Sequence, residues 1–165
     1  MPLGDGVRLN RGYLLADDAY SLLTWPGKPL AAQKEWAVRE PLTSVLVVAT
    51  GGGFGATLRY LTVLLGTRLF GTRFPVGTVA VNLIGCFVAG LLVGLLEKRL
   101  VLTPTAELLI FTGFLGAFTT LSTFSVETIG LFRSGSFGLA LANVMLNAVL
   151  GIGMVVVGML SAKAF

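Results

Sequence analysis

Residues 113–127 read GFLGAFTTLSTFSVE, and this stretch decides the fold that we expect for the chain. It lies within a long apolar segment, yet it carries two glycines, five hydroxyl side chains and the carboxyl of Glu127. A continuous helix facing lipid would leave these polar groups without partners. A helix that breaks inside protein exposes carbonyls and amides that can hold ions. The stretch therefore predicts a broken membrane helix. A Ser/Thr-rich helix whose hydroxyls bond back to its own carbonyls is the alternative.

Four long apolar segments follow residue 40, and the stretch belongs to the third of them. A bilayer core needs about 20 helical residues, and each segment meets that length. We expect spans at 42–65, 76–96, 106–132 and 137–160, joined by short loops. The expected fold class is an all-α membrane protein with four transmembrane helices and a break in the third.

Charge and composition divide the chain and exclude several functions. Half of the 12 basic and 8 acidic residues fall in the first 40 positions. We therefore expect a polar tail over 1–40 and one membrane domain over 41–165. The chain has no histidine, which excludes a His-ligated zinc site and a Ser-His-Asp triad, and its one cysteine, Cys86, excludes an internal disulfide. Scattered basic residues fit membrane topology better than a nucleic-acid surface. We expect neither an enzyme nor a nucleic-acid partner.

Basic residues after position 40 are balanced between the two sides of the membrane. Three lie on the side of the termini and three on the opposite side: Lys98, Arg99 and Lys163 against Arg68, Arg73 and Arg133. Basic loops set the orientation of a membrane protein, so this balance specifies none. One interpretation is insertion in both orientations followed by antiparallel pairing. The other is that the charges of the tail set a single orientation.

Small and polar residues recur at intervals of four in the second and fourth spans. The two stripes are Thr78, Asn82, Cys86, Gly90 and Gly94, and then Asn143, Asn147 and Gly151. Small residues at this spacing let helices approach closely, which explains the glycines and Cys86. The amides are explained either by hydrogen bonds between helices or by a polar path, where an amide NH2 donates to an anion.

Two ionisable residues lie within or near the spans. Arg59 is close to the expected end of the first span, where it either reaches the interface or draws anions into a vestibule. Glu127 shares a helical face with Thr119 and Thr123. Such a carboxyl is either the proton carrier of a coupled transporter or a hydrogen-bonding anchor near the membrane boundary.

Three ordered motifs together resemble one family, the small dual-topology fluoride channels called Fluc or CrcB. They are GGFGATLRY at 52–60, PVGTVAVNLIG at 75–85 and the stretch 113–127, within a match over roughly 44–160. The resemblance implies a multi-pass protein of a bacterial inner or plasma membrane that exports fluoride passively. It also implies an antiparallel homodimer with two anion pathways.

The resemblance also implies roles for individual residues. A structural sodium ion on the dimer axis would be held by the carbonyls of Gly116 and Thr119, which in an unwound segment can turn toward a common point. For Gly116 we expect a left-handed backbone, which glycine adopts without steric cost. Arg59 would lie near the aqueous entrance. The anion pathway would comprise Asn82, Phe124, Ser122, Thr123, Glu127, Asn143 and Asn147.

The chain departs from the family pattern at three positions. Leu121 stands where most relatives carry a phenylalanine, and Asn143 and Asn147 replace a more usual tyrosine and serine. A heterodimer with a paralogue would tolerate one degenerate pore half, so it is an alternative to the homodimer. The alternative function is a small proton-coupled multidrug or metabolite exporter. Such exporters carry their carboxylate in the first span, where this chain has Arg59 and no acid.

Overall fold

The computed structural model describes residues 41–98 and 101–164, so the expected tail at 1–40 lies outside the described residues. Within them, four helical spans are long and apolar enough to cross a membrane, at 41–70, 76–97, 104–133 and 137–164. The predicted all-α class and the four predicted spans are confirmed. The first helix continues beyond its expected end at residue 65 to residue 70.

The first and second spans are single helices, whereas the third and fourth are divided. The first is α3 (Pro41–Phe70) and the second is α4 (Val76–Glu97). The third consists of α5 (Pro104–Glu107), the π-helical η1 (Leu108–Leu115), α6 (Gly116–Phe118) and α7 (Leu121–Arg133). The fourth consists of α8 (Phe137–Val144), the π-helical η2 (Met145–Leu150), α9 (Gly151–Ser161) and η3 (Ala162–Ala164).

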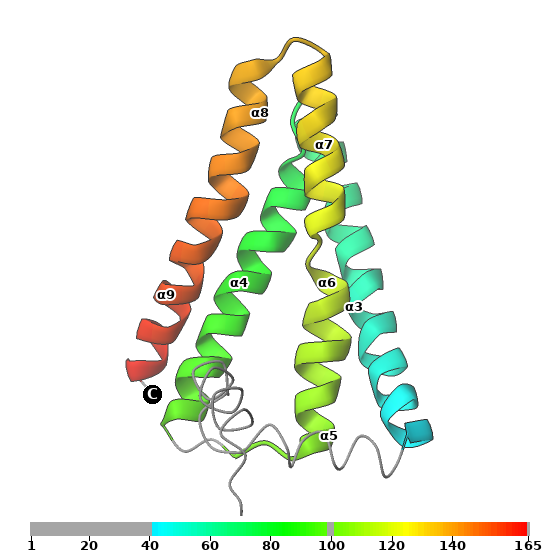
Figure 1. Cartoon of the computed structure of the whole chain (residues 1–165), viewed down its shortest axis with the longest axis vertical. Coiled ribbons are helices and arrows are strands. Elements are labelled where there is room, and N and C mark those ends of the chain that lie inside the picture. The colour runs from blue at the N-terminus through cyan, green and yellow to red at the C-terminus, as the bar shows by residue number, and fades with distance from the viewer. Residues whose placement is uncertain (1–40, 99–100, 165) are drawn as a thin grey trace, which may run out of the picture.

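The two halves of the third span pack on different neighbours (Figure 1). Its first half, through η1 and α6, lies against α3, while α7 lies against α8. Helix α4 packs along α9 and also contacts α3. The break between α6 and α7 therefore lies where the third span changes partner, beside α4 in the middle of the bundle.

Glycines make these helix contacts close, as the small-residue stripe predicted. A Cβ at Gly55 of α3 would collide with the carbonyl oxygen of Phe114, and one at Gly90 of α4 with that of Val155. At Gly94 the added Cβ would lie 2.8 Å from the carbonyl oxygen of Met159. Backbones that approach this closely gain dispersion contacts that larger side chains would prevent.

The predicted break in the third span is confirmed, and it is two residues long. Thr119 (ψ 159°) and Thr120 (φ −152°, ψ 112°) are extended, and the Thr120 hydroxyl caps α7 by accepting from the Thr123 N–H. Back-bonding hydroxyls, the alternative, are present as well: Thr119 donates to the Leu115 carbonyl and Ser125 to that of Leu121. The expectation of a left-handed Gly116 was wrong. Its φ of −62° and ψ of −34° are those of a right-handed helix, because the chain leaves helical geometry only after residue 118.

Candidate functional site

Asn82 of α4 holds the break in the third span. Its Oδ1 accepts from the Thr120 N–H at 2.9 Å, and its Nδ2 donates to the Thr120 carbonyl at 3.2 Å. The Asn82 side chain is 9% exposed and Thr120 is 7% exposed. An extended residue inside a bundle loses its helical hydrogen bonds, and the amide of Asn82 replaces both of them. The sequence explained Asn82 by a buried partner or a polar path, and the structure supplies the partner.

The same amide continues into a chain of hydrogen bonds toward the fourth span. Asn82 Nδ2 donates to Asn147 Oδ1 at 2.7 Å, and Asn147 Nδ2 donates to Asn143 Oδ1 and to the Asn143 carbonyl, both at 2.9 Å. Asn143 is fully buried, and its Nδ2 donates to the Thr128 hydroxyl of α7 at 2.9 Å. These three asparagines, called the asparagine ladder below, therefore link the second, third and fourth spans.

A largely apolar pocket of about 240 Å³ lies beside the break. It brings together Asn82, Phe124 and Asn147, three of the residues expected on an anion pathway. Asn143 does not line it, and neither do Ser122 and Thr123, which are exposed on the surface of the single chain. The remaining lining residues are Cys86, Thr119, Thr120, Leu121 and Ala148.

The break also redirects the amides that would otherwise bond the carbonyls of Gly116 and Thr119. In a helix these carbonyls accept from the N–H groups of residues 120 and 123 or nearby. Here the Thr120 N–H donates to Asn82 and the Thr123 N–H to the Thr120 hydroxyl. Gly116 is exposed and Thr119 partly exposed on the single chain. Two main-chain oxygens are thus available for a hard monovalent cation, so these residues fit the sodium ion that the resemblance implied.

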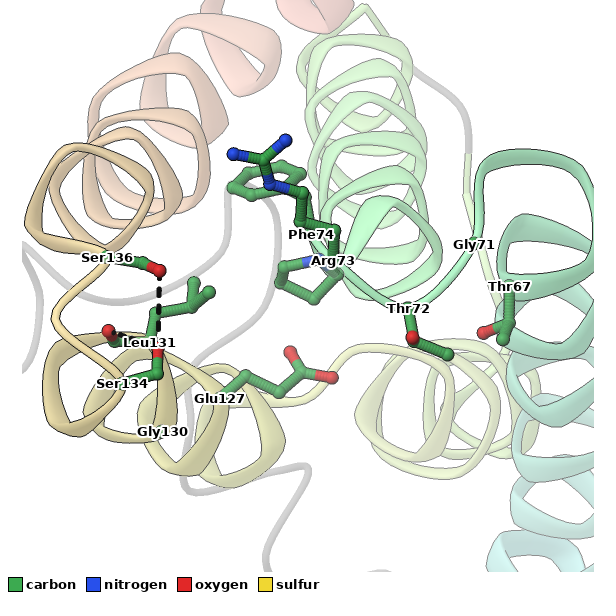
Figure 2. A pocket seen from close by; sticks show the side chains of 11 residues that line it. Thr67, Gly71, Thr72, Arg73, Phe74, Glu127, Gly130, Leu131, Ser134 and Ser136 are labelled. Atoms are coloured by element: carbon green, nitrogen blue, oxygen red, sulfur yellow. Dashed lines mark hydrogen bonds between the residues drawn. The ribbon is translucent and has the colours of Figure 1, made fainter.

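A second pocket, of about 480 Å³, lies at the end of the helical bundle that carries the α3–α4 and α7–α8 turns (Figure 2). It is called the vestibule below. Glu127 points into it from α7. Glu127 Oε1 accepts from the Thr78 hydroxyl at 2.8 Å, while its Oε2 has no hydrogen-bond partner among the described residues. The vestibule is otherwise lined by Thr67, Gly71, Thr72, Arg73, Phe74, Pro75, Gly130, Leu131, Ser134 and Ser136.

The basic residue that lines this pocket is Arg73, and Arg59 is not among its lining residues. Arg73 lies in the α3–α4 turn and lines the pocket, with its guanidinium pointing away from Glu127 (Figure 2). Arg59 lies within α3, partly exposed, and lines neither of the two pockets. The longer α3 explains this difference, since Arg59 is eleven positions before the end of the helix at Phe70.

Three residues of the site were not singled out from the sequence as pathway residues. Thr120 is the residue that Asn82 holds, Thr128 ends the asparagine ladder, and Thr78 binds Glu127. Only Thr78 had a sequence signal, because it begins the four-residue stripe that contains Asn82. Thr120 and Thr128 were indistinguishable from the other hydroxyl residues around them.

Four helical spans long and apolar enough to cross a membrane, with a break held by buried amides and a pocket beside it, define a small integral membrane protein. Residues 46–159 match the model of the family described as "CrcB-like protein, Camphor Resistance (CrcB)". The chain therefore belongs to this family, the CrcB/FluC fluoride channels. This membership also agrees with the expectation that the chain is not an enzyme.

Curated relatives carry the same name and are similar over most of their length. The protein of Maridesulfovibrio salexigens is 45% identical over 114 residues, which cover 69% of this chain and 90% of the relative. Those of Agrobacterium fabrum (41%) and Solibacter usitatus (44%) each align over 118 residues, which cover 72% of this chain and 94% and 97% of the relatives, respectively. Each is named fluoride-specific ion channel FluC.

Proposed function

We propose that this chain forms a channel through which fluoride crosses the membrane passively, which would lower fluoride toxicity. The observation that carries the proposal is the pocket beside the break, a largely apolar cavity into which the amides of Asn82 and Asn147 and the ring of Phe124 are brought together. Fluoride is small and strongly hydrated, so a path must offer donors in place of water. The Nδ2 groups of Asn82 and Asn147 are such donors; in the single chain their hydrogens bond Thr120, Asn147 and Asn143, so a permeating anion would replace one of these hydrogen bonds. The positive edge of the Phe124 ring is a weaker electrostatic partner.

The vestibule is proposed as the aqueous entrance to this path. Threonine and serine side chains line its wall, and Arg73 supplies a positive charge that attracts anions. Glu127 stands between vestibule and interior, where its bond to Thr78 holds the carboxyl in place. In a passive channel this carboxyl is a hydrogen-bonding anchor. In an exporter it would be the proton carrier.

The active unit is proposed to be an antiparallel dimer. Leu121 (76% exposed) and Val126 (73% exposed) project from α7, and Ser122 and Thr123 are exposed as well, although their hydroxyls lie 3.4 and 3.0 Å from the Thr120 hydroxyl. Hydrocarbon is a poor environment for such hydroxyls, so a protein surface is their favourable neighbour. A second copy in the opposite orientation would cover this face of α7, and the balanced basic residues permit both orientations.

A structural sodium ion is proposed at the centre of that dimer. The amides that would bond the carbonyls of Gly116 and Thr119 in a helix donate elsewhere, the Thr120 N–H to Asn82 and the Thr123 N–H to the Thr120 hydroxyl. Two copies would contribute four main-chain oxygens, which replace part of the hydration shell of a hard cation. The ion would hold the two breaks together and would not be transported.

A heterodimer with a paralogue remains the alternative assembly. Leu121 lines the pocket in place of the more usual phenylalanine, so both paths of a homodimer lack one of the two expected aromatic side chains. Purification of this chain expressed alone decides between the two assemblies. A dimer that conducts supports the homodimer, whereas a chain that purifies as a monomer supports the partnered form.

Fluoride efflux from liposomes tests the proposed function. Purified protein is reconstituted in vesicles loaded with fluoride, and efflux is followed with a fluoride electrode, with a potassium ionophore to balance charge and no pH gradient. The proposal expects rapid efflux under these conditions and little chloride efflux in a parallel measurement. Efflux that requires a proton gradient would favour the exporter, and absence of efflux would reject both.

A further inference from the structure

The asparagine ladder runs in one direction, and this direction is set by its two ends. It starts at the Thr120 N–H, which can only donate, so Asn82 must present Oδ1 to it. On the other side, Asn147 faces the main-chain carbonyl of Asn143, which can only accept, so Asn147 must present Nδ2 there. Reversal of either amide would oppose two donors or two acceptors. Each amide of the ladder therefore has one allowed orientation.

The ladder begins and ends on the third span. From Thr120 at the break it passes through Asn82, Asn147 and Asn143 to the Thr128 hydroxyl, which donates to the Phe124 carbonyl at 2.8 Å. It thus spans α7 from its N-cap to its third turn through two other helices. The first group, the Thr120 N–H, and the last, the Phe124 carbonyl, belong to the N-cap and the first turn of the same helix. The ladder therefore fixes the position of α7 relative to the break.

Every polar atom of the Asn82 side chain is used in this arrangement. Its Oδ1 takes the Thr120 N–H, and its two Nδ2 hydrogens go to the Thr120 carbonyl and to Asn147 Oδ1. Asn143, by contrast, is fully buried and does not line the pocket beside the break. A residue in this position cannot touch an anion in that pocket, and it can act only through its neighbours.

We infer that Asn147 and Asn143 are positioning residues: through the one-directional ladder they set the orientation of the Asn82 amide and keep Thr120 extended at the break. Asn147 supplies the acceptor for Asn82, and Asn143 supplies the acceptors that hold Asn147. The functional part of this inference rests on the proposed fluoride channel. The structural part, which concerns Thr120 and Asn82, does not depend on it.

Hydrogen exchange at Thr120 tests the structural part directly, because its N–H donates to Asn82. Asn147→Ala should raise exchange of the Thr120 amide about three- to twentyfold, the range that corresponds to one interhelical hydrogen bond in a membrane protein. Val149→Ala is the matched control, since Val149 lies in the same segment and is 57% exposed. The control should leave both exchange and fluoride efflux unchanged. Unchanged exchange in Asn147→Ala would overturn the inference.

A double-mutant cycle separates positioning from direct contact with the anion. If Asn143 acts through Asn147, Asn143→Ala and Asn147→Ala should reduce efflux singly, and the double variant should be no slower than Asn147→Ala alone. Fold-losses that multiply would mean two independent contacts and would overturn the inference. Should Asn147→Ala fail to fold, Asn147→Ser decides, because serine is tolerated in membrane helices but cannot reach both Asn82 and Asn143. A wild type without fluoride efflux would reject the proposed function, while the exchange measurement would still decide the ladder.

Discussion

Asn82→Asp separates the contribution of charge from that of structure in the pocket beside the break. The substitution keeps the shape of the side chain and the acceptor for the Thr120 N–H, but it removes the two bonds donated by Nδ2. Interhelical hydrogen bonds in membranes average about 0.6 kcal/mol, so the two lost bonds cost about 1 kcal/mol. The carboxylate oxygen that replaces Nδ2 also faces the Thr120 carbonyl and Asn147 Oδ1, and this repulsion adds to the loss of stability. A carboxylate about 4 Å from a permeating anion, at an effective dielectric constant of about 20, adds a barrier of about 4 kcal/mol. Fluoride efflux should therefore fall about a thousandfold.

Asn82→Leu is the matched variant, because it removes all three hydrogen bonds and adds no charge. Its loss of stability should be about 2 kcal/mol, from three lost hydrogen bonds and without the repulsion between oxygens that the aspartate variant adds. Its efflux should nevertheless exceed that of Asn82→Asp, since no fixed charge opposes the anion. Both variants are compared by fluoride-electrode efflux from liposomes and by unfolding in mixed micelles. Wild-type efflux in a correctly assembled Asn82→Asp protein would remove Asn82 from the path and refute the reasoning.

Three further predictions concern Glu127, the proposed cation site and topology. Glu127→Gln should fold, since an amide oxygen still accepts from Thr78, and its fluoride efflux should stay independent of a pH gradient; proton-driven transport lost in this variant would favour the exporter. Gly116→Leu should leave the single chain folded, because a Cβ there meets only the Phe111 carbonyl at 3.5 Å, but it should abolish the dimer and efflux. Thr119→Ser should change efflux less than about threefold, because the proposed ligand is a main-chain oxygen. Thorough replacement of sodium by a large organic cation should silence efflux, and an unaltered dimer and efflux would remove the site. In a Cys86→Ser background, a cysteine introduced at Lys163 should be labelled from both sides of the membrane in comparable amounts, and labelling from one side alone would reject dual insertion.

Local properties of the sequence were enough to predict the spans and the break. The length of an apolar segment and the clustering of hydroxyls in residues 113–127 are features of neighbouring residues, and the bilayer constrains such segments to helices. The glycine stripe of α4 also predicted a close helix contact correctly, since its period is that of the helix itself. The family resemblance added named positions, but it could not say how their side chains are arranged.

Contacts between distant residues decided the rest of the site. Asn82 bonds Thr120 and Asn147, which are 38 and 65 positions away in the chain, and nothing near Asn82 in the sequence selects them. The basic residue of the vestibule also depends on tertiary structure, because a helix that ends at Phe70 leaves Arg59 inside α3 and places Arg73 in the turn. Composition and spacing alone require that the polar groups of the spans find partners within protein. The packing of α4, α7 and α8 decides which polar groups bond one another. A hydrogen bond requires its donor and acceptor to lie within about 3 Å, and the positions of the helices set that distance.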